Sequence, residues 1–399
     1  MSRFVVVGIG ADGWAGLSGA AQRELGSAVR VFGSARQLDL LGSVLDAELT
    51  AWRSPMSEHL RAVLTATGGG PTHLLASGDP MFHGLGTTVA AAVGAQNVRI
   101  LPHPSSVSLA AAHLGWDLST VGVVSLVTGE IGDVLGEAGD RRRLFVLSRD
   151  ASSPHTVAEM LRDNGFGDST MTVLEQLGGP DERVFAGVAG AWGVAPGDAL
   201  NVIALECAGP SRVLTPGLPD DEFAHDGQLT KQAMRALTVA ALAPTGGTVL
   251  WDVGAGSGSV GIEWLRVNPT GSVVAFERNS DRIARIRSNA IRHGVAARLT
   301  VVAGDAAQTV PVFDGPAPDA VFAGGGLTAE VFSSLWSALG AGGTFVANAV
   351  SIPTQQLLVD LAARHGGALR RISIEEVAPL GTVTAWRPAL PIVEWVATA

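Results

Sequence analysis

The chain has 399 residues, a formal net charge of −10, 47% apolar residues, one cysteine and no tyrosine. This length is typical of two domains, and the single Cys207 excludes both an internal disulfide and a multi-cysteine zinc site. The acidic balance disfavours a nucleic-acid partner, no apolar run approaches the ~20 residues of a membrane span, and a reducing cytoplasm fits the cysteine content.

The first half alternates short apolar runs with helical stretches, which predicts an α/β domain with largely parallel strands. The run at residues 4–9 ends at Gly10 and is too short for a secretory signal, so we expect a strand there. A helix is predicted from Ser105 to Leu114. Further strands are predicted at residues 29–33, 72–77, 98–101, 121–126, 144–148, 170–175 and 199–206.

Residues 209–226 contain three prolines and little periodicity, which indicates a linker. A helix is then predicted over 228–242. Strands are predicted at residues 248–253, 272–277, 298–302, 319–323 and 344–349. Two longer runs, 369–377 and 383–396, have no helix between them, so we expect them to pair antiparallel. Five helix-linked strands followed by a β-hairpin predict a seven-stranded, Rossmann-like α/β sheet.

The clearest motif of the second half is the glycine-rich sequence from Leu250 to Gly258, which follows a predicted strand and opens a helix. Glycines at such a turn let a ligand approach the backbone beside a helix N-terminus. Glu277 ends the next strand, where a carboxylate can accept both ribose hydroxyls, and Gly304-Asp305-Ala306 ends the third, where an adenine would lie. A tight structural turn is the alternative, but three features at successive strand ends favour a nucleoside cofactor.

The spacing of the glycines separates two such cofactors. NAD-binding turns read Gly-x-Gly-x-x-Gly, whereas this turn reads Gly254-x-Gly256-x-Gly258. A methionine moiety carries no pyrophosphate, so S-adenosylmethionine fits the turn better than NAD does.

The second half also resembles a known family. Asp226-Gly-Gln-Leu-Thr-Lys231, the glycine-rich turn, the Gly324-Gly325-Gly326 triplet and Asn348-Ala-Val350 are similar to the CbiT-type precorrin decarboxylating methyltransferases over residues 224–399. The resemblance implies that residues 226–231 form a lid-like entry segment to the cofactor. An ordinary helix N-cap at Thr230 would also explain that segment.

By this resemblance, the turn passes beneath the methionine part of S-adenosylmethionine, a carboxylate holds the ribose, and the third strand end flanks the adenine. The implied cofactor residues are Thr230, Gly254, Ala255, Gly256, Ser257, Gly258, Glu277, Asp305 and Ala306. The implied substrate-facing residues are Gly324, Gly325 and Asn348.

The first half carries weaker motifs. Gly8-Ile-Gly10 follows the first strand, Gly78-Asp79-Pro80 follows another, and Pro104-Ser105-Ser106-Val107 opens a helix. Proline fixes φ after a strand end and glycine permits close approach. The Ala76-to-Phe82 run and the Pro-Ser-Ser segment resemble the tetrapyrrole methylase family, especially its CbiE-type members, over residues 1–206.

That resemblance implies a two-subdomain α/β fold with the cofactor in the cleft between the subdomains. It implies cofactor contacts from Gly78, Asp79, Pro80, Ser105 and Ser106, and a substrate-facing loop at Gly8 and Gly10. One departure matters: related sequences often carry His-Gly-Arg after the strand that ends at Leu126, whereas this chain reads Val127-Thr-Gly-Glu130. The alternative is a docking domain with a vestigial site.

A CbiE-like half (1–206), a linker (207–223) and a CbiT-like half (224–399) together resemble the fused, CobL-type precorrin methyltransferases. The resemblance implies methylation of precorrin-6B at carbons 5 and 15, with decarboxylation of the ring C acetate, to give precorrin-8X in cobalamin biosynthesis. It implies S-adenosylmethionine as methyl donor, no metal, and self-association into a homo-oligomer.

The residues that would handle the substrate's carboxylates are less defined. Basic candidates are Lys231, Arg370, Arg371 and Arg387, and His225 is a candidate proton donor that also fits a solvated linker histidine. No catalytic residue is assigned. An RNA or protein methyltransferase, and a non-enzymatic module in which one half only binds, are the alternatives from other classes.

Overall fold

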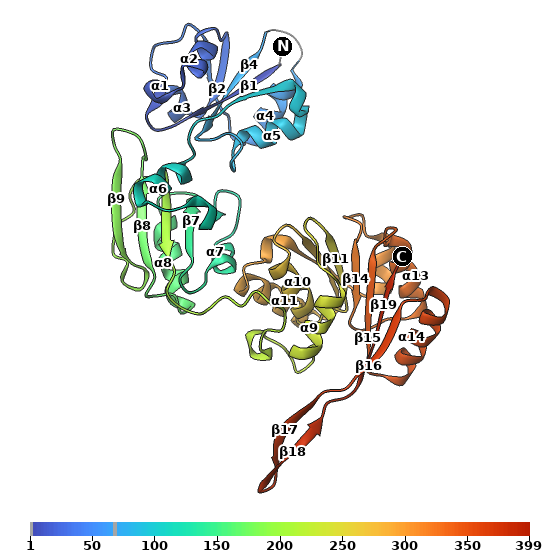
Figure 1. The fold of residues 1–399 in the computed structure, drawn as a ribbon. Helices are drawn as coiled ribbons and strands as arrows, with labels where there is room; N and C mark the ends of the chain where they lie inside the picture. The colour runs from blue at the N-terminus through green and yellow to red at the C-terminus, as the bar shows by residue number, and fades with distance from the viewer. Residues whose placement is uncertain (1–2, 67–69) are drawn as a thin grey trace. The chain divides into compact units, whose positions relative to one another are not determined.

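The computed structural model describes residues 3–66 and 70–399, and the chain separates into two compact units (Figure 1). The first unit comprises Met1–Ile131 and Ala138–Pro210, and the second comprises Gly132–Glu137 and Ser211–Ala399. In the described part of the chain, no helix is both long and apolar enough to cross a membrane.

The first sheet of the first unit is parallel, with strand order β3-β2-β4-β1-β5. All six residues of the central strand β1 are buried, as expected for a parallel strand with helices on both faces. The strands are β1 (Phe4–Ile9), β2 (Arg30–Gly33), β3 (Glu48–Ala51), β4 (Thr72–Ser77) and β5 (Val98–Leu101). The helices are α1 (Gly13–Gly16), α2 (Gly19–Gly26), α3 (Ala35–Asp39), α4 (Met56–Thr65) and α5 (Leu85–Val93).

The second sheet of this unit is mixed, with order β6-β7-β10-β8-β9. Helix α6 packs Val107 and Ala110 against Phe145 of this sheet. The strands are β6 (Gly122–Ser125), β7 (Arg143–Leu147), β8 (Thr170–Glu175), β9 (Arg183–Val188) and β10 (Asn201–Glu206), and the helices are α6 (Ser106–Leu114) and α8 (Ser153–Asp163). The first unit is therefore a two-subdomain α/β structure.

The second unit is built on a seven-stranded sheet of order β13-β12-β11-β14-β15-β19-β16, in which β19 alone is antiparallel to both its neighbours. The strands are β11 (Val249–Val253), β12 (Ser272–Glu277), β13 (Leu299–Ala303), β14 (Ala320–Ala323), β15 (Thr344–Ala349), β16 (Ala368–Ile372) and β19 (Ile392–Thr398). The helices are α7 (Gly132–Glu137), α9 (Gln232–Ala241), α10 (Ser259–Val267), α11 (Ser280–Arg292), α12 (Ala306–Thr309), α13 (Ala329–Ala338) and α14 (Ile352–His365). This is the predicted seven-stranded, Rossmann-like methyltransferase layout.

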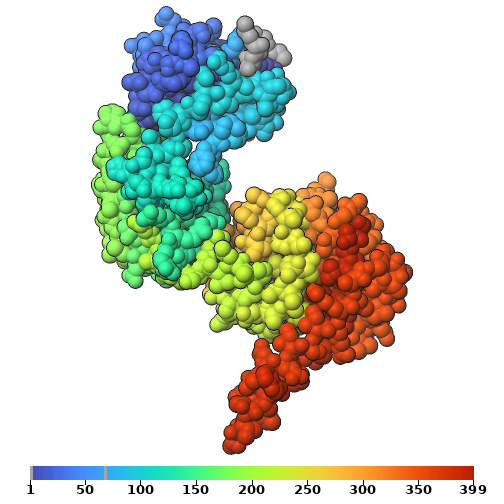
Figure 2. Space-filling view, viewed as in Figure 1, coloured from blue at the N-terminus to red at the C-terminus, as the bar shows by residue number. Residues whose placement is uncertain are grey.

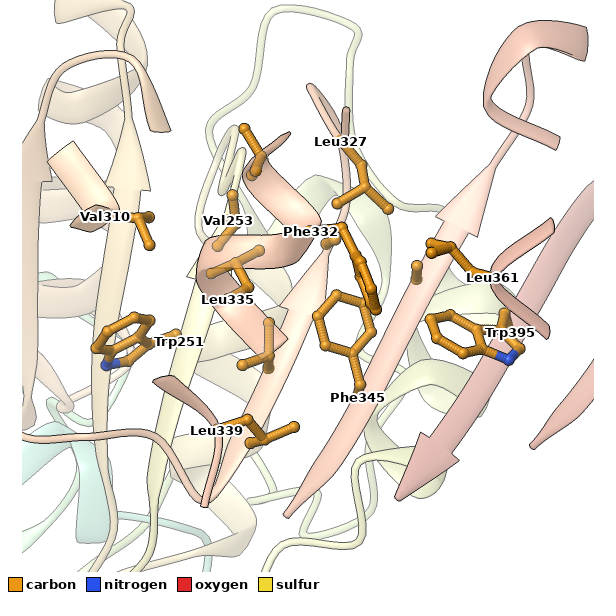
Figure 3. Packing of buried hydrophobic residues seen from close by; sticks show 14 of the residues in the cluster. Trp251, Val253, Val310, Leu327, Phe332, Leu335, Leu339, Phe345, Leu361 and Trp395 are labelled. Atoms are coloured by element: carbon orange, nitrogen blue, oxygen red, sulfur yellow. The ribbon is translucent and has the colours of Figure 1, made fainter. Parts of the chain in front are cut away.

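One core of this unit lies between the sheet and α13. Figure 3 shows Phe332 and Leu335 packed beside Phe345 and Trp251 of the sheet. Trp395 of β19 joins the same cluster and is fully buried, which fixes the last antiparallel strand to the sheet.

A separate two-stranded sheet, β17 (Glu375–Leu380) with β18 (Val383–Pro388), extends from the body of the second unit (Figures 1 and 2). The predicted antiparallel pairing of the two last runs is thus confirmed. Each run is divided between two sheets, however. The first run forms β16 in the main sheet and then β17 in the hairpin, and the second forms β18 in the hairpin and then β19 in the main sheet.

Most strand predictions agree with the structure to within two residues. Strands β3 and β9 were not predicted; both are mostly exposed edge strands, and β3 carries no continuous apolar run, whereas β9 has one at residues 184–188 that was missed. The predicted helix from residue 228 begins at Gln232 instead. The N-cap is Lys231, without a side-chain cap bond, so the N-cap alternative for Thr230 is wrong.

The proline-rich residues 211–223 pack onto the second unit. Leu218 and Phe223 are buried in the cluster that also holds Val239 and Trp264. Helix α7 also belongs to the second unit, although the residues before and after it in the chain belong to the first. It packs closely there, because a Cβ added to Gly136 would lie 2.7 Å from the carbonyl oxygen of Gly294.

Candidate functional site

The glycine-rich turn after β11 requires glycine for conformational reasons. Gly254, Gly256 and Gly258 have φ angles of 69°, 61° and 77°, in the left-handed region that side chains disfavour. A Cβ on Gly254 would also lie 2.6 Å from the carbonyl oxygen of Gly325. The nearest described atom to a Cβ on Gly256 is the Gln228 carbonyl oxygen, 3.9 Å away, so the turn keeps open space there.

Backbone hydrogen bonds bring the three predicted strand ends together. The amides of Gly254 and Ala255 donate to the carbonyl of Phe276 at 3.0 and 3.2 Å, and the amide of Gly304 donates to the carbonyl of Glu277 at 3.0 Å. The ends of β11, β12 and β13 therefore form one continuous rim, because parallel strands present their carboxyl ends on the same edge.

Glu277 is the carboxylate of this rim. It is 5% exposed, its Oε2 accepts from the amide of Gly256 at 2.9 Å, and its Oε1 accepts from the amide of Asn279 at 2.9 Å. Each carboxylate oxygen can accept a second hydrogen bond. The group is thus held rigidly and retains acceptor capacity for a vicinal diol.

Asp305 and Ala306 end the third strand of the rim. The Asp305 side chain accepts from the amide of Ala307 at 3.0 Å and caps α12, and it lies 3.5 Å from the guanidinium of Arg278. Ala306 packs beside the main core cluster. Asp305 therefore caps a helix and Ala306 packs against the core, and both residues lie at the rim formed by the strand ends.

One buried polar group lies under the turn and another lies within it. Asp252 is 1% exposed, and its Oδ2 accepts from the amide of Gly261 at 3.1 Å. Burial raises the pKa of this carboxyl to about 7; the Gly261 amide opposes the shift, and the charge of Glu277 adds to it. The hydroxyl of Ser257, within the turn itself, is buried and has no hydrogen-bond partner among residues 3–66 and 70–399.

The entry segment is fastened to this turn by residues that no motif signalled. Asn289 of α11 accepts from the Ala224 amide at 2.8 Å and donates to the carbonyls of Ala224 (3.0 Å) and Ser257 (2.9 Å). Arg282 donates to Asp226 Oδ2 at 2.8 Å and to Gln228 Oε1 at 2.6 Å. The bond from Arg282, together with the Gln228 amide, lowers the pKa of Asp226.

A buried ion pair holds the other end of the entry segment. Arg235 is fully buried; its Nε donates to Glu263 Oε1 at 2.6 Å, and its Nη1 donates to the carbonyl of Thr230 at 2.6 Å. Asp220 contacts both cations of this region, lying 3.2 Å from Arg235 and 3.3 Å from Lys231 Nζ. Arg235, one helical turn after Lys231, therefore fixes the position of Thr230, and Asp220 fixes that of Lys231.

The predicted substrate-side residues lie at the next two strand ends. Gly324 donates to the carbonyl of Val253 at 3.0 Å, which puts the glycine triplet against the turn after β11. Asn348 of β15 donates to Thr238 Oγ1 at 2.8 Å, while its Oδ1 is buried without a partner in the described structure. Arg370 of β16 donates to Glu394 at 2.7 Å, and Glu394 of β19 pairs with Asn348, so Arg370 stands in register with Asn348 two strands away. Arg387 lies on β18 opposite Glu376. A substrate contact from either arginine stays a prediction.

In the first unit, the three predicted segments meet at the carboxyl edge of the parallel sheet. Gly78 has a φ of 58°, and a Cβ added there would lie 3.3 Å from Ser105 Cα, while one added to Gly8 would overlap the carbonyl oxygen of Gly78. Ser105 accepts from the Ser108 amide at 3.0 Å and caps α6. Asp79 accepts from the Met81 amide at 2.8 Å.

The same contact network extends to the remaining predicted residues of this unit. The carbonyl of Pro80 accepts from the amide of Gly86 at 2.9 Å, and Ser106 is the first residue of α6. A Cβ added to Gly10 would lie 2.5 Å from Cε1 of His103, a residue that the sequence did not single out.

Two arginines of this unit were also missed. Arg36 of α3 donates to Ser77 Oγ at 3.1 Å, directly before the Gly78 turn, and burial lowers its pKa while Asp198 opposes the shift. Arg149, which follows β7 of the second sheet, donates to the carbonyls of Leu126 (2.9 Å) and Gly129 (2.8 Å) and holds the loop at residues 127–130.

Comparison with known proteins gives consistent matches for both halves. Residues 3–191 match the family described as tetrapyrrole (corrin/porphyrin) methylases, and residues 221–399 match the precorrin methyltransferase domain. The chain is 43% identical over 399 residues to a precorrin-6Y C(5,15)-methyltransferase [decarboxylating] of Mycobacterium tuberculosis, covering 99% of each chain. It is 42% identical over 397 residues to the protein of the same description from a Sinorhizobium species, covering 98% of this chain and 95% of the other.

Among solved structures, the C-terminal domain of precorrin-6Y C5,15-methyltransferase from Rhodobacter capsulatus is 42% identical and covers 47% of this chain and all of its own, with a TM-score of 0.45.

Proposed function

Because the chain belongs to the family of decarboxylating precorrin-6Y C(5,15)-methyltransferases, we propose that it methylates precorrin-6B at carbons 5 and 15 and removes carbon dioxide from the ring C acetate. The product is precorrin-8X, an intermediate of cobalamin biosynthesis. The observation that carries this proposal is the identity of 43% over nearly the whole length of a two-domain relative.

The two reactions divide between the two halves. Residues 1–206 methylate carbon 5, residues 224–399 decarboxylate and methylate carbon 15, and residues 207–223 connect them. Each half binds S-adenosylmethionine, which supplies a methyl group already activated on a sulfonium.

In the second half, the residues of the rim fit this cofactor. Glu277 accepts hydrogen bonds from the ribose hydroxyls, and the open backbone from Gly254 to Gly258, with the unpartnered Ser257 hydroxyl, receives the methionine part. Asp305 and Ala306 flank the adenine, and Thr230 closes over the cofactor from the entry segment.

The substrate lies on the other side of the methyl group. Gly324 and Gly325 let the macrocycle approach the backbone, and Asn348 offers its unpartnered Oδ1 as an acceptor. The main contribution of these residues is alignment in a near-attack geometry, because the macrocycle carbon is itself the nucleophile. The macrocycle can also delocalise the electrons left by decarboxylation.

Lys231 is a cation that can meet a substrate carboxylate, since its side chain is 63% exposed although its Nζ contacts Asp220. His225 accepts from the Gly227 amide through Nδ1 at 3.0 Å, so its neutral ring carries the proton on Nε2. Donation of a proton in the decarboxylation requires the imidazolium form, in which Nδ1 also carries a proton and no longer accepts from the Gly227 amide. His225 is proposed as that donor because of its place beside Asp226 in the entry segment.

In the first half, the Gly78-Asp79-Pro80 turn and the start of α6 at Ser105 and Ser106 contact the cofactor. Gly8 and Gly10 face the substrate side of the same edge. The contacts among the Gly8–Gly10 loop, the Gly78 turn and the start of α6 support this assignment, because these three segments form one surface at the ends of β1, β4 and β5.

We also propose that the protein self-associates. The β17–β18 hairpin carries four large apolar side chains, each more than half exposed: Val377, Leu380, Val383 and Trp386. Such a gathering of exposed apolar groups on an extended element is typical of an association surface. No nucleic-acid partner is proposed, given the net charge of −10.

The test is an anaerobic incubation of the full chain with precorrin-6B and S-adenosylmethionine, followed by mass spectrometry of the product. A gain of two methyl groups with loss of one carbon dioxide is the expected outcome. One methyl with loss of carbon dioxide would restrict the activity to the second half. An unchanged substrate, with the cofactor bound, would refute the substrate assignment.

A further inference from the structure

A histidine and a carboxylate that no motif signalled lie side by side at the carboxyl edge of the first sheet. Asp12 follows β1 and His103 follows β5, the strand that pairs with β1. His103 Nε2 is 3.3 Å from Asp12 Oδ1; the imidazole is buried, whereas the Asp12 side chain is 31% exposed. The pair therefore has one buried and one accessible member at the proposed substrate-facing loop.

Glycines make room for this pair. A Cβ on Gly10 would lie 2.5 Å from His103 Cε1 and 2.6 Å from Asp12 Oδ1, and one on Gly16 would overlap the carboxylate of Asp12. A Cβ on Gly8 would lie 2.8 Å from the backbone nitrogen of His103. Gly10 and Gly16 are thus explained by the placement of the His103 and Asp12 side chains, and Gly8 by the close approach of the Gly78 and His103 backbone.

Helix capping does not account for Asp12. The residue occupies the N-cap position of α1, yet its side chain accepts no hydrogen bond from that helix. Its Oδ1 is buried and makes no aligned hydrogen bond to any described residue, and it lies 3.3 Å from His103 Nε2. A buried carboxylate oxygen in this condition calls for a functional explanation.

Each ring nitrogen of the imidazole faces an acceptor oxygen. His103 Nδ1 lies 3.1 Å from the carbonyl oxygen of Pro104, and Nε2 faces the carboxylate. A proton delivered to the pair can therefore be held between Nε2 and the Asp12 carboxylate, while Nδ1–H donates to the Pro104 carbonyl.

We propose that the Asp12–His103 pair accepts the proton that the macrocycle releases when the first unit methylates carbon 5. This inference rests on the proposed function. Carbon 5 forms a bond to the methyl carbon, the carbon–sulfur bond breaks with its electron pair remaining on sulfur, and the macrocycle gains one positive charge. The charge is removed when one proton leaves the macrocycle for the Asp12 carboxylate, with the buried imidazole sharing it.

The titratable and charged groups at this edge come from several elements. Asp12 lies on the β1–α1 connection, Asp79 follows β4, and Arg36 of α3 contacts Ser77. Of these three charged groups, Asp12 contacts the imidazole of His103.

The test uses the full chain with Asp12→Asn and His103→Gln variants, precorrin-6B, and S-adenosylmethionine labelled with ¹³C in its methyl group. Product NMR then distinguishes the carbon 5 methyl from the carbon 15 methyl. Each variant is expected to slow carbon 5 methylation by ~100-fold or more, the range typical of a lost general base. The low-pH limb of the wild-type carbon 5 rate should disappear, while calorimetric affinity for S-adenosylmethionine stays unchanged.

His113→Gln is the matched control, because His113 forms a similar but exposed pair with Glu182, at 3.5 Å, in the same unit. It should leave the carbon 5 rate unaltered. An unchanged carbon 5 rate in the Asp12→Asn and His103→Gln variants, a parallel loss of cofactor affinity, or a persisting low-pH limb would overturn the role of the pair. A wild-type chain that never methylates carbon 5 would overturn the assignment of the first half itself.

Discussion

Replacing Asp252 by asparagine should remove a pH-dependent loss of unfolding free energy from the second unit. The carboxyl is 1% exposed, and burial raises its pKa from 3.8 to about 7. The folded state therefore binds a proton that the unfolded state releases between pH 3.8 and about 7. The free energy of unfolding should fall as the pH rises through this window and level off above it.

The magnitude follows from the size of the shift. About three pKa units at roughly 1.4 kcal/mol each give a loss of about 4 kcal/mol by pH 8. Asparagine keeps the shape of the side chain and can still accept from the Gly261 amide, but it cannot ionise. The Asp252→Asn variant should therefore be more stable than the wild type at pH 8, and the difference should shrink towards pH 5.

The measurement is the free energy of unfolding in urea at pH values from 5 to 8. Unfolding is monitored by hydrogen–deuterium exchange in peptides that cover β11 and α10, so that only the second unit is observed. Asp319→Asn is the matched control, because Asp319 is exposed and also accepts a backbone amide, that of Val249, at 2.8 Å. Equal pH slopes in the wild type and the Asp252→Asn variant would refute the reasoning.

Three further predictions follow from the site and the surface. Glu277→Gln should weaken S-adenosylmethionine binding to the second unit by about 10- to 100-fold, the loss expected for charge-assisted hydrogen bonds; calorimetry of the full chain, with the first unit's binding event as internal reference, measures it. Arg235→Met should cost about 3–5 kcal/mol of unfolding free energy by leaving Glu263 buried and unpaired, and adding Glu263→Leu should recover most of it in urea unfolding. Trp386→Ser should shift the protein towards monomer in light scattering without changing its thermal unfolding, whereas an unaltered mass would exclude the hairpin from self-association.

The sequence by itself determined the features that depend on local physics. Apolar runs predicted the buried strands, because a strand covered on both faces must be apolar throughout. The three glycines of the turn after β11 were identified because glycine lets a ligand approach the backbone beside a helix N-terminus, and their left-handed φ angles in the structure require glycine as well. The end of β12 placed Glu277 on the same rim as that turn, because parallel strands share a carboxyl edge.

The sequence could not reveal contacts between residues distant in the chain. Asn289 fastens the entry segment to the glycine-rich turn from a helix whose pattern is that of any amphipathic helix. Strand β3 carries no apolar run, and the exposure of β9 at a sheet edge is decided by its pairing and not by its residues.

Only the tertiary structure could bring Asp12 to His103 and Arg235 to Glu263. In each pair, neither residue lies in a motif, and each side chain alone fits an ordinary surface or cap position. Their chemistry arises from burial and from the direction in which neighbouring acceptors point, and both of these are properties of the packed chain. Local sequence specifies backbone conformation and apolar pattern, whereas the electrostatic environment of a side chain exists only once distant segments have excluded water around it.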